Sequence, residues 1–509
     1  MIDGIKASFD NERYLQTQSD AIMDRVARFS GKLYLEFGGK LLSDMHAARV
    51  LPGYDPDVKI KLLQRLKDVV DIVYCIRAKD IEAGRIRGDF GLTYDAASLR
   101  TFDDLEDFGF SVSAVIINRY RGEKSATRFL NFLESRGIRV YTQPEIDGYP
   151  ADVDKIVSDE GYGQCPFIET TRPLVIVTGA GPGSGKMATG LAQVYHHQSR
   201  GQQAGFAKFE TFPVWNLPLD HPLNLAYEAA VADLKDRNLV DPFHLEAYGE
   251  TVINYNRDIE NFSIMRAIMA QIGAQGPGAM DYRSPSEMGV NMVKAGILDD
   301  DTVRAAATRE IIRRYFRYSW EHKQGLESRE TVQVVERLLQ QVGAKVTDYP
   351  IVPAARQAAE EAKQRGKGDR GIFCGAALEL PSGEIVTGMN STLMHAEAAL
   401  LLNVIKKLGG IPKQIDLLPP SIIANVCSLK EDIQQRKTAG LNVEEILVAL
   451  SIGAATNPTA GHCMQQLKLL KGCDMHSTHV VARGSENGLR LLGIVTTTDG
   501  LPVTRGFYY

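Results

Sequence analysis

A glycine-rich loop between residues 177 and 190 carries the clearest chemical signal in the sequence. It reads VTGAGPGSGKMATG, with a glycine at every second position from 179 to 185 and Lys186 directly afterwards. Glycines allow backbone N–H groups to converge on an anion, and the start of a following helix adds partial positive charge. We therefore predict a phosphate- or nucleotide-binding loop made of Gly181, Gly183, Ser184, Gly185, Lys186 and Thr189.

The loop departs from the P-loop pattern GxxxxGK[ST] at two positions. Ala180 replaces the first glycine, and Met187 replaces the hydroxyl residue that would ligate magnesium. Three interpretations stay open: a modified P-loop for ATP or another nucleotide, an NAD-type loop in which Glu210 binds a ribose hydroxyl, and a purely structural turn. Phosphate or nucleotide binding is favoured over NAD. Without a magnesium ligand, transfer or ligation is favoured over hydrolysis.

Polar residues beyond the loop are candidates for catalysis. Glu210 ends the next β-rich run, at the edge where parallel sheets bind their ligands. The planar guanidinium of Arg257 suits a second phosphate or a carboxylate, and the imidazole of His476 titrates near neutral pH. We predict these three residues to be catalytic, although solvated interdomain charge is an open alternative for the first two.

His395 and Glu397 begin a helix directly after a predicted hairpin, which resembles the first half of the zinc nucleoside-deaminase signature. The second half, PCxxC, is missing: Pro419 and Pro420 are present, but Cys427 follows alone. Zinc held by one histidine would lack ligands. We therefore expect a deaminase-like fold without zinc chemistry, as in folate-dependent transformylases.

A second group, Cys473, His476 and His479, has soft ligands at three-residue spacing. On a strand, however, residues i and i+3 point to opposite faces. The protease motif HExxH is missing from the sequence. We predict no metal site, and we keep a metal-dependent hydrolase or deaminase using both groups as an alternative function. A non-enzymatic nucleotide sensor or scaffold is a further alternative.

The elements that position these residues alternate regularly in the first part of the chain. Short β-rich runs begin at Lys32, Asp71, Ser113, Ile138, Pro173 and Gly205, with amphipathic helical segments between them. Continuous apolar runs indicate strands covered on both faces, so we predict a Rossmann-like, doubly wound parallel sheet. The predicted domains are 1–215, a mainly helical middle domain 216–345, and a C-terminal mixed α/β domain 346–509 that resembles the cytidine-deaminase fold.

Composition excludes several classes of protein. The 509 residues are 44% hydrophobic and 24% charged, with a net charge of −5 and six scattered cysteines. No basic excess suggests nucleic acid, no apolar run approaches 18 residues, and the amino terminus is polar. We expect a cytoplasmic homo-oligomer whose partner is a phosphorylated small molecule or nucleotide, with no nucleic acid and no membrane.

Several segments together resemble a bacterial family described as a domain of unknown function, DUF1846. They include DNERYLQTQSDAI, KLYLEFGGKL, IVSDEGYG, GPGSGKMATGL, AKFETFPVWNLPLDHPLNLAYEAA, NYNRDIE, ALSIGAATNPTA and GCDMHSTH. The resemblance runs nearly end to end. It implies a cytosolic multidomain α/β protein with a Rossmann-like first domain, a helical middle and a deaminase-like end, and it implies no particular activity.

Overall fold

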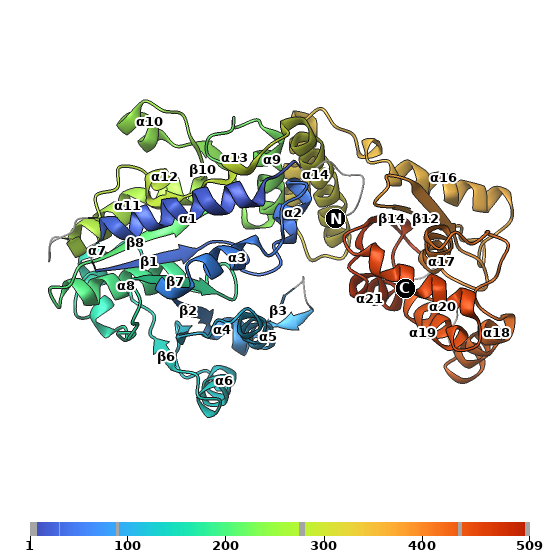
Figure 1. The fold of residues 1–509 in the computed structure, drawn as a ribbon, viewed down its shortest axis with the longest axis horizontal. Helices are drawn as coiled ribbons and strands as arrows, with labels where there is room; N and C mark the ends of the chain where they lie inside the picture. The colour runs from blue at the N-terminus through green and yellow to red at the C-terminus, as the bar shows by residue number, and fades with distance from the viewer. Residues whose placement is uncertain (1–7, 30, 88–90, 274–279, 436–439, 504–509) are drawn as a thin grey trace. The chain divides into compact units, whose positions relative to one another are not determined.

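The computed structural model describes residues 8–29, 31–87, 91–273, 280–435 and 440–503. Within these residues the chain divides into two compact units, which we call the N-terminal unit (up to residue 307) and the C-terminal unit (from residue 308). Figure 1 shows a sheet with flanking helices in each unit. None of the described helices is long and apolar enough to cross a membrane.

The N-terminal unit contains a seven-stranded parallel sheet in the order β11-β8-β1-β7-β2-β5-β6. Its strands are β1 (Lys32–Phe37), β2 (Val70–Arg77), β5 (Ala114–Asn118), β6 (Val140–Gln143), β7 (Leu174–Gly179), β8 (Ala204–Phe209) and β11 (Gly289–Val290). The six predicted β-rich runs and their parallel arrangement are confirmed. The short strand β11 was not predicted.

Apolar side chains cover both faces of this sheet. Every residue of β5 and β8 is buried, as is all of β7 except its last residue. Because successive side chains of a strand point to opposite faces, such runs need packing on both sides. Helix α8 (Lys186–Gln198) packs on one face, where Leu191 and Val194 join a core containing Tyr34, Val177 and Phe206.

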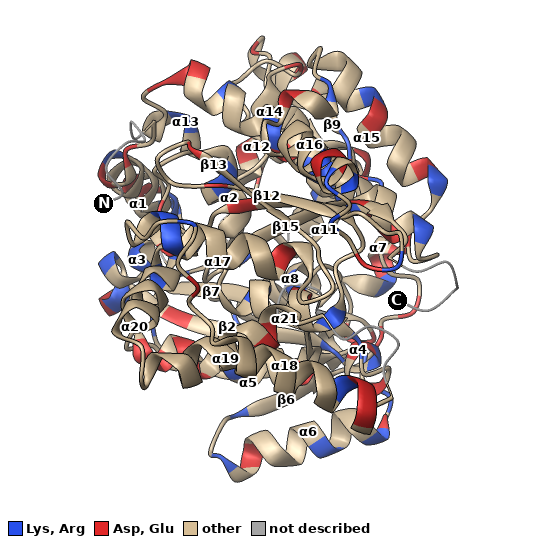
Figure 2. Ribbon diagram, turned by 90° about the vertical axis from the view of Figure 1, so that its right-hand side faces the viewer, with Lys and Arg blue, Asp and Glu red and all other residues tan. Residues whose placement is uncertain are grey.

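Helices of 4 to 18 residues make up much of the rest of this unit. They are α1 (Asn11–Arg28), α2 (Met45–Val50), α3 (Val58–Arg65), α4 (Ala78–Glu82), α5 (Tyr94–Asp107), α6 (Lys124–Ser135), α7 (Val153–Ile156), α9 (Pro222–Ala230), α10 (Pro242–Tyr248), α11 (Asn256–Gly273), α12 (Pro285–Met288) and α13 (Val293–Gly296). Two ribbons, β3–β4 (Ile86–Arg87, Leu92–Thr93) and β9–β10 (Asn238–Val240, Ile253–Tyr255), are additional to the prediction. Figure 2 shows basic and acidic residues interspersed along the helices, as on α6.

The segment DTVRAAATREIIRRYFRYSWEHK, whose pattern predicts a long amphipathic helix, lies in α14 (Asp300–Lys323), within which one unit ends and the other begins. The C-terminal unit has a four-stranded mixed sheet in the order β13-β12-β14-β15. Its strands are β12 (Gly375–Glu379), β13 (Ile385–Met389), β14 (Asp474–His479) and β15 (Val495–Leu501). The predicted hairpin β12–β13 is confirmed, β14 runs antiparallel to β12, and β15 runs parallel to β14.

Helices make up much of the rest of the C-terminal unit. They are α15 (Arg329–Gln341), α16 (Ile351–Gln364), α17 (Ala396–Leu408), α18 (Pro420–Ser428), α19 (Val443–Ala454), α20 (Pro458–Gln465) and α21 (Arg483–Leu491). The glycine pair Gly409-Gly410 predicts a helix end, and α17 does end at Leu408, with a φ of +66° at Gly410. Both units are therefore mixed α/β, each with its own buried apolar core.

Candidate functional site

A cavity of about 650 Å³ lies at the carboxyl ends of the parallel strands in the N-terminal unit. Its lining includes Gly38 after β1, Asn118 at the end of β5, Gln143 at the end of β6, Gly179 at the end of β7 and Lys208 near the end of β8. Ligands of open parallel sheets bind at this edge. The volume is in the range typical of small-molecule sites.

The glycine loop forms part of the cavity wall. It connects β7 to α8, and Gly183 and Gly185 have φ angles of +71° and +93°, which favour glycine. Within the described part of the chain, the backbone N–H groups of Gly183, Gly185 and Lys186 donate to no protein acceptor. The loop therefore presents unused donors at a helix N-terminus beside an empty space of ligand size.

Asn118 fixes the shape of this loop. Its Nδ2 donates to the carbonyl oxygen of Ser184 at 2.7 Å, and its Oδ1 accepts from the Thr189 hydroxyl at 3.4 Å. The side chain is 3% exposed, and a Cβ on Gly185 would come within 2.5 Å of Asn118 Nδ2. Asn118 was not among the residues predicted from the sequence. The available signal was a polar residue at the end of the apolar run SAVIIN.

The predicted loop residues divide into two groups. Gly181, Gly183, Gly185 and Lys186 line the cavity. Ser184 and Thr189 do not belong to the lining: both side chains are buried, and Thr189 also bonds to Gln143 Oε1 at 3.4 Å. Lys186 is the first residue of α8, and its Nζ donates to the carbonyl oxygen of Gly181 at 3.4 Å. The first group is therefore placed to meet a ligand. In the second group, Thr189 bonds Asn118 and Gln143, and the Ser184 hydroxyl has no hydrogen-bond partner among the described residues.

Glu210 lines the same cavity next to a buried ion pair. Lys208 Nζ bonds both carboxylate oxygens of Asp258 at 2.5 and 2.6 Å, and the Glu210 carboxylate accepts from the Tyr255 hydroxyl at 3.3 Å. Burial raises the pKa of Glu210 to about 8, although nearby Lys208 acts in the opposite direction. For Lys208, burial alone would lower the pKa, but Asp258 outweighs it and the pKa is raised. The site thus contains a carboxyl group that exchanges its proton near neutral pH.

Arg257 also lines the cavity and is about half exposed. It forms an ion pair with Asp236, and its guanidinium lies 6.0 Å from the centre of the Tyr255 ring. Since a guanidinium has five N–H donors and one carboxylate uses at most two, the pairing leaves donors for a ligand. Glu210, Arg257 and the glycine loop thus share one cavity.

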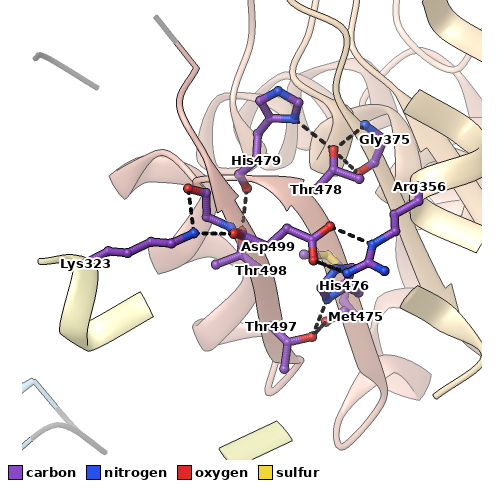
Figure 3. Close-up of polar contacts among 11 residues, drawn as sticks. Lys323, Arg356, Gly375, Met475, His476, Thr478, His479, Thr497, Thr498 and Asp499 are labelled. Atoms are coloured by element: carbon purple, nitrogen blue, oxygen red, sulfur yellow. Dashed lines mark hydrogen bonds and ion pairs between the residues drawn. The ribbon is translucent and has the colours of Figure 1, made fainter. Parts of the chain in front are cut away.

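The third predicted catalytic residue, His476, lies in the C-terminal unit on β14 and is fully buried. Its Nδ1 lies 2.9 Å from Thr497 Oγ1, and its Nε2 lies 3.5 Å from Asp499 Oδ1 (Figure 3). Asp499 also accepts two hydrogen bonds from Arg356, at 2.6 and 3.0 Å. Burial would raise the pKa of Asp499, but His476 and Arg356 outweigh it and hold the pKa well below its ordinary value. These contacts connect β14, β15 and α16 inside the C-terminal unit.

The other candidate groups are also in the C-terminal unit. His395 caps α17 and burial lowers its pKa to about 4, while the buried Glu397 accepts from the Ser477 hydroxyl at 2.7 Å. His476 and His479 lie on the same strand, β14, where two residues three positions apart point to opposite faces of the sheet. Among the residues that the structure describes, no group of three or more His, Cys, Asp or Glu side chains is arranged to hold a metal ion.

Comparison with known proteins places the chain in a family. The description "Domain of unknown function DUF1846, N-terminal" matches residues 7–343, and "Domain of unknown function DUF1846, C-terminal" matches residues 347–508. The chain belongs to the DUF1846 family. The resemblance expected from the sequence segments is therefore confirmed.

DUF1846 relatives match this chain over nearly all of its length. A UPF0371 protein of Clostridium tetani is 48% identical over 505 residues, and a UPF0371 protein of Clostridium botulinum strain Eklund 17B is 49% identical over 506 residues. Each alignment covers 99% of this chain and 100% of the relative. The DUF1846 chain thus corresponds to the whole length of these bacterial relatives.

Proposed function

We propose that this protein binds a phosphorylated small molecule or a nucleotide in the cavity of the N-terminal unit. The observation that carries the proposal is the glycine loop, where unused backbone donors and Lys186 line a space of ligand size. A phosphate would satisfy the N–H groups of Gly183 and Gly185, and Lys186 would neutralise part of its charge.

The strand order favours a phosphate loop over an NAD-type loop. In a dinucleotide-binding fold of order 3-2-1-4-5-6, the strand after the glycine loop lies directly beside the loop strand. Here β1 lies between β7 and β8, so Glu210 is two strands from the loop strand. This argues against Glu210 as the ribose ligand of an NAD site and leaves the modified P-loop as the favoured interpretation.

We further propose an enzyme that catalyses transfer or ligation, with Glu210 as proton donor or acceptor and Arg257 as oxyanion ligand. Met187 occupies the position where hydrolytic P-loops hold magnesium, so hydrolysis of a bound nucleotide is not favoured. A sensor that binds without turnover is the alternative. Product formation in a substrate-cocktail assay supports the enzyme, and binding without product supports the sensor.

For the C-terminal unit we propose a deaminase-like fold without zinc chemistry. The hairpin β12–β13, followed by α17 with His395 and Glu397, supports the fold. The separation of His476 and His479 on β14 argues against the metal-dependent alternative. Metal analysis of the purified protein tests it: about one zinc per chain would revive the hydrolase or deaminase interpretation.

Isothermal titration with ATP, NAD and ribose 5-phosphate tests the main proposal, using the wild type and the variant Lys186→Ala. We expect at least one phosphorylated ligand to bind, and the variant to bind it about tenfold more weakly or worse. Lys124→Ala is a matched control, because Lys124 is also the first residue of a helix, is exposed and lies outside the cavity lining. Absence of binding by all three ligands, or equal binding by Lys186→Ala, would show that the loop is structural.

A further inference from the structure

A charged network lines the same cavity at the ends of β1 and β8. The two strands are parallel neighbours, and their register places Glu36 opposite Lys208. Glu210 lies two residues beyond Lys208, and residues i and i+2 of an extended chain share a face. Glu36, Lys208 and Glu210 therefore project from the same side of the sheet, and all three line the cavity.

Within this network the positive charge already has a partner. Lys208 and Asp258 form a close ion pair, with side chains 7% and 13% exposed. Glu36 Oε2 has no solvent access and no hydrogen-bond donor within the described ranges, and the Glu210 carboxylate has the Tyr255 hydroxyl as donor. Buried carboxylate oxygens need donors. A ligand in the cavity can supply them.

The chain also keeps space open beside Glu210. A Cβ on Gly38 would lie 3.2 Å from Glu210 Oε2 and 3.0 Å from the carbonyl oxygen of Phe209, so a side chain there would crowd the carboxylate. Gly38 itself lines the cavity. Glu36 and Glu210 thus border the same cavity as the glycine loop, and the Glu36 carboxylate must rotate for its buried oxygen to meet a ligand there.

We propose that Glu36 and Glu210 bind two hydroxyl groups of a sugar whose phosphate lies on the glycine loop. This inference rests on the proposed phosphate site and adds the substrate class, a phosphorylated sugar. Hydroxyls fit because each can donate one hydrogen bond to a carboxylate oxygen, and the close ion pair with Asp258 already occupies the Lys208 ammonium group. A hydroxyl can donate to Glu210 beside the Tyr255 hydroxyl, because a carboxylate can accept several hydrogen bonds.

Sugar phosphates and nucleotides share this chemistry, and a hydroxyl-deletion series separates them. Titrations of the wild-type protein compare ribose 5-phosphate with 2-deoxyribose 5-phosphate, and AMP with 2′-deoxy-AMP, with inorganic phosphate as the reference. We expect removal of one hydroxyl to weaken binding about 10- to 100-fold in at least one pair. The ligand pair whose affinity changes shows whether the bound sugar belongs to a sugar phosphate or to a nucleotide.

Variants then assign the effect to the two carboxylates. In Glu36→Ala or Glu210→Ala, we expect the affinity ratio between the hydroxyl and deoxy ligands to fall to within about twofold, because the lost hydroxyl no longer has an acceptor. Glu134→Ala is the control, since Glu134 is an exposed residue of α6 outside the cavity lining. Circular dichroism checks that each variant is folded. The titrations of the wild-type protein test the hydroxyl effect by themselves, so the test still works if a variant does not fold.

The outcomes distinguish this inference from the proposed function. Phosphate binding that depends on Lys186, combined with equal affinity for hydroxyl and deoxy ligands, overturns the sugar assignment alone. Loss of the affinity difference in Glu134→Ala as well as in the two variants also overturns it. Absence of any Lys186-dependent binding overturns both proposals.

Discussion

At the scale of single residues, the carboxyl group of Glu210 is kept protonated near neutral pH by its surroundings. Burial raises its pKa to about 8, whereas an unfolded glutamate titrates near pH 4.3. Between these two values the folded chain binds one proton more than the unfolded chain does. The contribution of Glu210 to the free energy of unfolding therefore falls as the pH rises through this window.

Replacement of Glu210 by glutamine should remove this pH dependence. We expect the variant to gain stability relative to the wild type between pH 5 and pH 8, by up to about 1.4 kcal/mol for each pH unit, and the difference to level off above pH 8. Urea unfolding at several pH values measures it. A constant difference from pH 5 to pH 9 would show that Glu210 titrates normally.

For Asp499, in the C-terminal unit, the change of stability with pH has the opposite sign. Its pKa is lowered, so its contribution to stability is present above the unfolded pKa of about 4 and is lost as the pH falls below that value. Asp499→Asn should be less stable than the wild type at pH 7, and the two should converge in acid. Parallel unfolding curves at pH 7 and pH 3 provide the comparison, and an unchanged gap at pH 3 contradicts the prediction.

Asn118 should matter for binding through the loop that it holds. Asn118→Ala leaves the buried carbonyl of Ser184 without its donor, so we expect a loss of about 1–3 kcal/mol in the free energy of unfolding and weaker phosphate binding. Asn131→Ala, at an exposed position of α6, is the matched control. Thermal unfolding and titration together measure both effects, and intact binding by Asn118→Ala would show that the loop keeps its shape alone.

At the scale of elements, the loop between β7 and α8 depends on two left-handed glycines. Alanine at Gly183 meets no atom within 4 Å, so its cost comes from the backbone conformation, about 1–2 kcal/mol. Alanine at Gly185 has the same strain and also collides with Asn118. We expect Gly185→Ala to abolish phosphate binding and to destabilise the chain more than Gly183→Ala.

Gly137→Ala controls for strain in this comparison. Gly137 has a φ of +76° and open space for a Cβ, and it follows α6 outside the cavity lining. In thermal unfolding, Gly137→Ala should lose about as much stability as Gly183→Ala does. In titration, it should bind the ligand as the wild type does. Equal ligand affinity in all three variants would mean that the loop does not contact phosphate.

Elements with a strong local pattern could be predicted from the sequence. A local apolar or periodic pattern predicts the six β-rich runs, the hairpin β12–β13 and the helices α14 and α17. Strand β11 has two residues and exists because it pairs with β8, and the ribbon β9–β10 has three residues in each strand. Such short strands are stabilised by distant partners, so no local pattern marks them.

The candidate site was predictable to a similar extent. The loop residues and Glu210 follow strands, and the edge of a parallel sheet brings strand ends together. Asn118 is the last residue of a strand, but an asparagine at the end of an apolar run also begins many turns. The strand order, which separates β7 from β8 by β1, depends on long-range packing and could not be read from the sequence.

At the scale of the whole molecule, the two units have separate hydrophobic cores. His476 was predicted to be catalytic together with Glu210 and Arg257; it is fully buried in the C-terminal unit, and the other two residues line the cavity of the N-terminal unit. Residue types indicate which chemistry is possible. They do not indicate which distant segments meet.

Separate cores predict separable effects of mutation. Leu401 is 1% exposed in the C-terminal core, so Leu401→Ala should cost about 2–5 kcal/mol there. Hydrogen exchange should increase in residues 308–503, while phosphate affinity in the N-terminal unit stays within about twofold. Loss of binding in this variant would show that the two cores are energetically coupled.

The position of β7 has a consequence for how the chain reaches its fold. Strands β1 and β2 do not pair with each other, because β7, synthesised about 100 residues after β2, lies between them. Until residue 179 has left the ribosome, the inner edges of both strands lack their native neighbour. Unpaired apolar strand edges attract other chains. The strand that ends in the glycine loop is therefore also the one that joins β1 to β2, and slow synthesis before it arrives should favour aggregation.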